Sequence, residues 1–135
     1  KKLSKNLGLN DFISFKGNCR HENVMDLLSK NHLFVFPTET KEGFPKALIE
    51  SLSCGLPVIA SRVSVIPYLI ENKCGLILDK PNPDSIYHSI IKITSNIHEL
   101  EMMGKKSREI SEFFTLDNWR LKIKGRLEKK WGILN

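Results

Sequence analysis

The strongest constraint on the fold is the order of patterns in the middle of the chain. Residues 33–36 read Leu-Phe-Val-Phe and residues 58–60 read Val-Ile-Ala, with a polar turn and a short helical pattern between them. Apolar runs of this length and continuity are typical of strands buried on both faces of a parallel sheet. A short helix between two such runs predicts a Rossmann-like α/β domain with a parallel sheet and flanking helices.

The same pattern extends over most of the chain and predicts one domain, residues 1–135. A chain of 135 residues with 41% hydrophobic content can bury one core but hardly two. Asn23 is the expected cap of the second helix, and Pro45 is suited to the first position of the third. Because the chain begins inside a helical pattern, we expect it to be truncated at its N-terminal side. We expect about four strands, at 13–15, 33–36, 58–60 and 76–78, and helices at 1–7, 24–29, from 45, at 67–71, 84–94, 98–113 and 116–131.

Bulk features exclude several classes of protein. No apolar run approaches the roughly 18 to 20 residues that span a bilayer, and the N-terminus lacks the profile of a signal peptide. Cys19, Cys54 and Cys74 are too widely spaced to indicate a disulfide framework or a zinc site. These features predict a cytoplasmic protein in a reducing compartment, with the cytoplasmic face of the inner membrane as the place of any membrane contact.

The formal charge of +6 lies at the two ends of the chain. Residues 1–5 contribute +3 and residues 115–135 contribute +4, so residues 6–114 have a net charge of −1. A nucleic-acid-binding module needs basic residues interleaved with exposed aromatic residues on one face. The nearly neutral centre argues against that alternative, and we expect no nucleic-acid partner.

Two carboxylates, Glu42 and Glu50, flank the start of the helix that follows the strand at 33–36. A helix N-terminus at the carboxyl end of a parallel strand favours anionic ligands, because free N–H groups and the helix dipole point to it. A simpler alternative stays open: Glu50 could lie on a solvated helix face and pair with Lys46 four residues earlier. Glu42 could likewise be a loop carboxylate stabilised near a helix start.

An ordered set of short motifs resembles a known family. Any one of them would be weak evidence, but their order along nearly the whole chain is specific. The set resembles the C-terminal, donor-binding half of GT-B glycosyltransferases of family 4 (group 1), in which two glutamates eight residues apart are a signature. The motifs are residues 15–17, 21–22, 34–38, 42–45, 50, 54–60, 66–67 and 75–76.

The resemblance implies a nucleotide-sugar donor and a role for each residue around it. It places Glu42 against the donor sugar as the catalytic residue, and it places Glu50 on the two ribose hydroxyls, which one carboxylate can accept. The turn at 43–45 would border the sugar, the helix start would lie under the diphosphate, and residues 18–21 would approach the base. The implied donor-binding residues are Gly43, Phe44, Pro45, Lys46, Ala47, Leu48, Glu50, Asn18, Arg20 and His21.

Further expectations follow from the resemblance. It implies a retaining transfer of a hexose to a glycan or lipid-linked acceptor bound by a missing N-terminal domain, in lipopolysaccharide or surface polysaccharide synthesis, without a bound metal or cofactor. The Arg and Lys that usually grip the diphosphate would precede Lys1, so donor affinity should be poor. Because the acceptor-binding half is also missing, this part alone should be inactive. Tyr68 and His32 also stand where the family usually has acidic residues.

Two alternatives remain from the sequence. One is a sugar-nucleotide epimerase or a phosphorylase on the same scaffold. The Glu-Gly-Phe-Pro turn and the later Glu count against it.

The other concerns residues 115–135, whose apolar residues recur every four positions among basic ones. This terminal helix could pack on a protein core, toward the missing domain, or it could lie on an anionic membrane.

Overall fold

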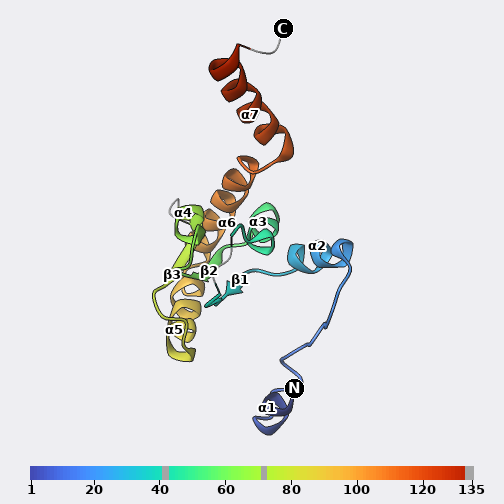
Figure 1. Cartoon of the computed structure of the whole chain (residues 1–135). Helices are drawn as coiled ribbons and strands as arrows, with labels where there is room; N and C mark the ends of the chain where they lie inside the picture. Colours follow the sequence, from blue (N-terminus) through green and yellow to red (C-terminus); the bar gives the residue numbers. More distant parts are fainter. Residues whose placement is uncertain (41–42, 71–72, 133–135) are drawn as a thin grey trace.

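Three parallel strands form the centre of the computed structural model, which describes residues 1–40, 43–70 and 73–132 (Figure 1). The strands are β1 (Phe34–Phe36), β2 (Val58–Ser61) and β3 (Gly75–Leu78), in the order β1-β2-β3. In register, Val35 lies opposite Ile59, which lies opposite Leu76. The predicted parallel α/β architecture is confirmed.

The predicted strand at 13–15 is wrong. Residues 13–15 are not in a strand, and Ile13 and Phe15 expose their side chains. The turn at Gly17 ends this stretch after three residues, and no described strand lies beside it. A strand needs backbone hydrogen bonds to a neighbouring strand, so three apolar residues are not enough to form one. The described part of the sheet therefore has three strands instead of about four.

Seven helices are present in the described residues. The predicted ends of the last three helices are correct to within one residue, whereas the second helix begins earlier than predicted. Asn23 lies inside that helix and does not cap it, because the backbone at Arg20 is already the extended residue that precedes the first turn. The helices are α1 (Lys2–Asn6), α2 (His21–Ser29), α3 (Lys46–Ser53), α4 (Ile66–Ile70), α5 (Pro83–Thr94), α6 (Ile97–Glu112) and α7 (Leu116–Trp131).

The central strand β2 divides the core into two layers. Val58 and Ala60 pack with residues of α3 and α4 on one face, whereas Ile59 packs with α5 and α6 on the other. This alternation follows from the two-residue period of a strand. All four residues of β2 are buried, as expected for a strand covered on both faces.

Gly75 allows β3 to begin close beside β2. A Cβ atom at position 75 would lie 1.9 Å from the carbonyl oxygen of Val58, a distance at which the strands would have to move apart. The start of β3 therefore requires glycine because of backbone proximity. This close approach helps to fix the position of β3, the edge strand that follows α4.

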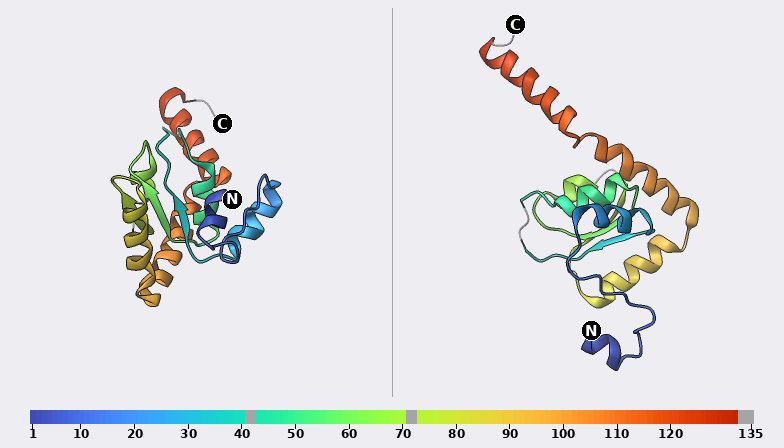
Figure 2. Two further views of the ribbon diagram at one scale, coloured as in Figure 1. Left: turned by 90° about the horizontal axis from the view of Figure 1, so that it is seen from below. Right: turned by 90° about the vertical axis from the view of Figure 1, so that its right-hand side faces the viewer.

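Helix α7 extends away from the sheet, and α1 lies off the body at the other end (Figures 1 and 2). Thr115 caps α7 through a hydrogen bond from the Asn118 amide, and Gly132 ends it in the left-handed conformation. None of the residues of α7 is buried. Among the residues that the structure describes, no helix combines the length and apolar character needed to cross a bilayer.

Candidate functional site

The candidate site begins at the turn that joins β1 to α3. Pro45, predicted at the first helical position, lies one residue earlier with an extended backbone (φ −74°, ψ 95°). Its carbonyl accepts hydrogen bonds from the amides of Leu48 and Ile49. Within the described chain the amides of Lys46 and Ala47 have no acceptor, so they form the open N-terminus of this helix.

The core holds α3 in place beneath this open end. Leu48 and Leu52 are fully buried and pack against β2, while Lys46 and Ala47 are exposed. The implied donor residues thus separate into two kinds. Lys46 and Ala47 face outward, where a ligand could reach them, whereas Leu48 contributes its side chain to the core and its amide to the first turn.

Glu50 is an enclosed carboxylate on α3. Its side chain is 16% exposed, and Oε1 lies 3.3 Å from Nζ of Lys46 and 3.4 Å from Nδ1 of His21. Neither contact has hydrogen-bond geometry, and Oε1 is shielded from solvent without a hydrogen-bond partner in the described chain. The pairing with Lys46 agrees with the simpler alternative, but the enclosure of Glu50 does not correspond to a solvated face.

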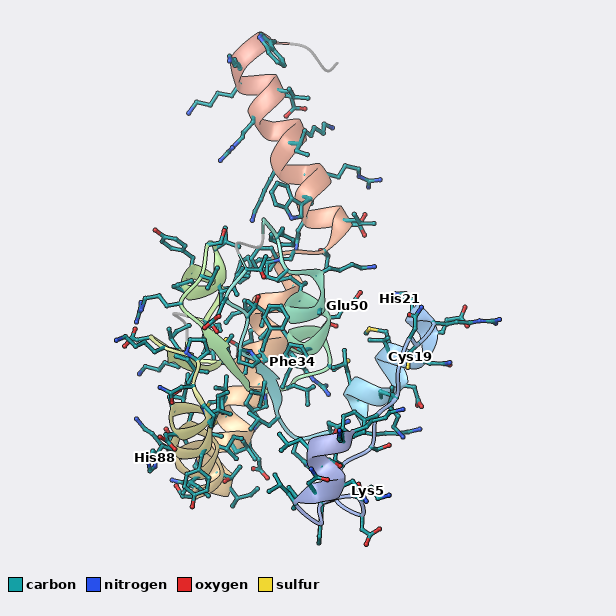
Figure 3. All side chains as sticks on the ribbon, turned by 60° about the horizontal axis from the view of Figure 1, so that its bottom comes forward. Lys5, Cys19, His21, Phe34, Glu50 and His88 are labelled. Atoms are coloured by element: carbon teal, nitrogen blue, oxygen red, sulfur yellow. The ribbon has the colours of Figure 1, made fainter. Side chains whose placement is uncertain are left out.

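Helix α2 brings His21 to Glu50. His21 is the first residue of α2, and this helix packs beside α3 (Figure 3). Sγ of Cys54, at the end of α3, lies 4.0 Å from the carbonyl oxygen of Met25 in α2. Asn18 and Arg20 lie in the exposed segment that leads into α2. Among the described residues their side chains form no hydrogen bond or ion pair with α3, whereas His21 lies within ion-pair distance of Glu50.

The turn has an additional support that sequence reasoning missed. The ring of Phe44 packs on the ring of Phe114, with centroids 5.6 Å apart and planes tilted by 53°. Phe114 lies between α6 and α7, seventy positions later, and no local pattern links the two residues. Gly43 has open space where a side chain would be, so its neighbourhood can admit a ligand.

Glu42, the predicted catalytic residue, lies outside the described residues. The described part of the chain holds no group of three or more His, Cys, Asp or Glu side chains placed to bind a metal ion. The chemistry that can be assigned from geometry is therefore that of an open helix N-terminus, one enclosed carboxylate and two basic side chains. Such a set suits a ligand with both phosphate and hydroxyl groups.

Comparison with known families decides among proteins that carry such a site. The family described as glycosyl transferases group 1 matches residues 1–110 of the 135. The chain belongs to this family. The resemblance inferred from the sequence motifs is confirmed.

Relatives in the family have diverse names. The chain is 31% identical over 108 residues to N-acetyl-alpha-D-glucosaminyl L-malate synthase of Bacillus anthracis, covering 79% of this chain and 28% of that protein. It is 26% identical to D-inositol 3-phosphate glycosyltransferase of Streptomyces bingchenggensis, covering 86% of this chain and 26% of the relative. This group 1 chain thus spans little more than a quarter of these relatives.

Solved structures agree on the fold. Sucrose-phosphate synthase from Thermosynechococcus elongatus superposes with a TM-score of 0.79 and 27% identity, covering 96% of this chain and 32% of the other. WaaG, a glycosyltransferase involved in lipopolysaccharide biosynthesis, superposes with a TM-score of 0.73 and 19% identity, covering 96% of this chain and 34% of the other. The group 1 chain corresponds to about a third of either structure.

Proposed function

We propose that this chain is the donor-binding part of a retaining glycosyltransferase. The enzyme transfers a hexose from a nucleoside-diphosphate sugar to a glycan or lipid-linked acceptor, in lipopolysaccharide or surface polysaccharide synthesis. Membership of the group 1 family supports the transferase activity. The identity of the acceptor, and the retention of anomeric configuration, rest on the resemblance of the sequence motifs.

The observation that carries the proposal is the enclosed carboxylate of Glu50 beside the open start of α3. A nucleoside diphosphate presents phosphate oxygens to free amides and two ribose hydroxyls to a carboxylate. Lys46 and Ala47 are exposed residues whose amides have no acceptor in the described chain, and Glu50 supplies a carboxylate one turn later on the same helix. One short helix can thus bind both ends of the ribose-diphosphate unit.

The chemistry that follows is departure of the nucleoside diphosphate from the sugar. Negative charge grows on the leaving phosphate, and the amides and dipole of α3 stabilise it without having to reorganise. Positive charge grows on the sugar, and we assign its stabilisation to Glu42, on the basis of the family resemblance. The segment that holds Asn18 and Arg20 is proposed to approach the base, with His21 at its end beside Glu50, and Phe44 is proposed to border the sugar.

Thermal stabilisation by a panel of GDP-, UDP- and ADP-sugars tests this function in the complete gene product. Binding to the folded state alone raises the melting temperature in a concentration-dependent way. We expect one nucleotide class to stabilise the wild type and Glu50→Gln to weaken its affinity at least tenfold, because a charge-assisted hydrogen bond is lost. A phosphorylase would instead respond to a sugar 1-phosphate and inorganic phosphate.

Glu128→Gln is the matched control for Glu50→Gln. Glu128 also lies four residues after a lysine on a helix, 3.7 Å from Nζ of Lys124, but on α7 and more exposed. We expect nucleotide affinity to be unchanged in this variant. If no nucleotide binds the wild type while Glu50→Gln lowers its melting temperature, Glu50 is structural and the proposed function is wrong.

The surface of α7 supports a second proposal, a peripheral contact with an anionic membrane. Leu116, Trp119 and Ile123 are exposed there, and basic side chains surround them. Flotation of the complete gene product with vesicles tests the contact. We expect flotation with phosphatidylglycerol-containing vesicles and none with phosphatidylcholine alone, because lysine and arginine are attracted to anionic lipid. Absence of flotation with both would remove this proposal.

A further inference from the structure

The contact between His21 and Glu50 joins two helices, unlike the other contact of the same carboxylate. Lys46 reaches Oε1 from four residues earlier on α3, whereas His21 reaches it from the first position of α2. Together they leave Oε1 covered, although the side chain of Glu50 as a whole retains some exposure. The remaining exposed surface of Glu50 must therefore lie on its other atoms.

The two basic side chains differ in how well they can fix a carboxylate. The side chain of Lys46 is 77% exposed and ends a flexible four-carbon stem, so it follows the carboxylate rather than orienting it. The imidazole of His21 is planar, turns about two bonds, and starts from a helix that packs on α3. His21 therefore restricts the direction of Glu50 more than Lys46 does.

We propose that His21 is a positioning residue for nucleotide binding: it holds Oε1 of Glu50 from α2, so that the second carboxylate oxygen faces the ribose hydroxyls. This inference rests on the proposed function, in which Glu50 binds the ribose. The Nδ1 to Oε1 distance of 3.4 Å is long for a hydrogen bond. Contacts of this kind in ligand-free sites commonly shorten when the ligand binds.

A role in stability would have a different signature. His21 is 61% exposed in its side chain, and exposed ion pairs contribute little to folding. Removing the imidazole should therefore leave the melting temperature of the ligand-free protein unchanged. Its effect should appear only when a ligand uses the carboxylate of Glu50.

Calorimetry on the complete gene product can isolate that effect. UDP, GDP and ADP are compared with their 2′,3′-dideoxy counterparts, which lack the hydroxyls that Glu50 would accept. For the nucleotide that binds, we expect His21→Ala to weaken the ribonucleotide roughly tenfold, as for one hydrogen bond to a charged group. Binding of the dideoxy counterpart should not change. In a Glu50→Gln background, His21→Ala should cause no further loss.

Two conservative variants sharpen the test. The amide nitrogen of Asn can occupy the position of Nδ1, whereas that of Gln corresponds to Nε2. We expect His21→Asn to restore most of the ribonucleotide affinity and His21→Gln to restore little. His88→Ala is the matched control, because His88 is an exposed histidine on α5, remote from Glu50 (Figure 3), and should leave binding unchanged.

Three results would overturn the inference. Equal losses for the ribonucleotide and the dideoxynucleotide would mean that His21 contacts the base or phosphate directly. An unchanged affinity in His21→Ala would mean that Glu50 is oriented without it, and the proposed function would survive. If the wild type binds none of the nucleotides, the proposed function fails and the inference fails with it.

Discussion

Helices α3 and α7 show how differently two helices with regularly spaced apolar residues can be used in one chain. Helix α3 has eight residues and buries Leu48, Ser51 and Leu52, whereas α7 has sixteen residues and buries none. The shorter helix lies between β1, β2 and α6, which cover its apolar side. The apolar side of α7 has no such cover in the described chain. Amphipathic character predicts a helix, but the surrounding elements decide whether it is buried.

The difference separates a rigid region from an open one. The candidate nucleotide site is built on α3, whose position is fixed by two buried leucines. Ligand-binding groups on such an element can be held in a defined geometry before the ligand arrives. The surface of α7 is available for a partner instead. Binding of a small ligand is therefore expected at α3 and contact with a larger surface at α7.

The largest expected effect comes from truncating one buried side chain on α3 and one exposed side chain on α7. We expect Leu52→Ala to lower the free energy of unfolding by about 2 to 5 kcal/mol, because it opens a cavity against β2. Ile123→Ala on α7 should change it by less than about 0.5 kcal/mol. Urea unfolding followed by circular dichroism measures both. A loss of similar size in Ile123→Ala would show that α7 is covered in solution.

The same contrast can be tested through pH. Cys74 is buried in the core, and this desolvation raises the pKa of its thiol from 9.0 to about 11. Since the folded pKa exceeds the unfolded one, the contribution to stability is complete below pH 9 and is lost as the pH rises toward 11. Two pKa units correspond to at most about 2.7 kcal/mol.

A comparison of wild type with Cys74→Ala isolates the contribution of this thiol. All other titratable groups are the same in the two proteins, so their contributions cancel in the comparison. We expect the unfolding free energy of the wild type to fall more steeply between pH 9 and 10.5 than that of Cys74→Ala. Parallel pH dependence in urea unfolding would show that the thiol is not desolvated in the folded protein.

The sequence predicts helices and strands well where a local pattern of apolar residues is long enough to identify them. The last three helices and the strands β1, β2 and β3 lie where apolar runs and helical periodicity predict them. The strand predicted at 13–15 failed because pairing depends on a neighbour that three apolar residues do not supply. Helix α2 began early because a backbone conformation at Arg20, and not a capping side chain, starts it.

The site was predictable as a set of positions but not as a set of contacts. The Gly-Phe-Pro turn and Glu50 can be found from local spacing, since a helix start and its acidic residue are close in sequence. The contacts of His21 with Glu50 and of Phe44 with Phe114 join distant segments. They depend on how α2, α3 and α6 pack together, and no local pattern in the sequence reveals that packing. The assigned role of Glu42 remains a prediction.

The smallest expected effect comes from two serine variants on α6, and it tests where along this helix the rigid region ends. Ser107 is fully buried. Its hydroxyl is within hydrogen-bond distance of two carbonyl oxygens, that of Met103 in the same helix and that of Leu56 in the segment between α3 and β2. Ser111, one turn nearer α7, donates only to Arg108 of its own helix among the described residues. Replacing either serine with alanine gains the same helix propensity, so that gain cancels in the comparison. We expect Ser107→Ala to be less stable than Ser111→Ala by about 1 kcal/mol in urea unfolding, because the carbonyl of Leu56 loses its buried donor. Equal stability of the two variants would mean that the tightly packed region ends before Ser107, and that the last two turns of α6 belong with α7.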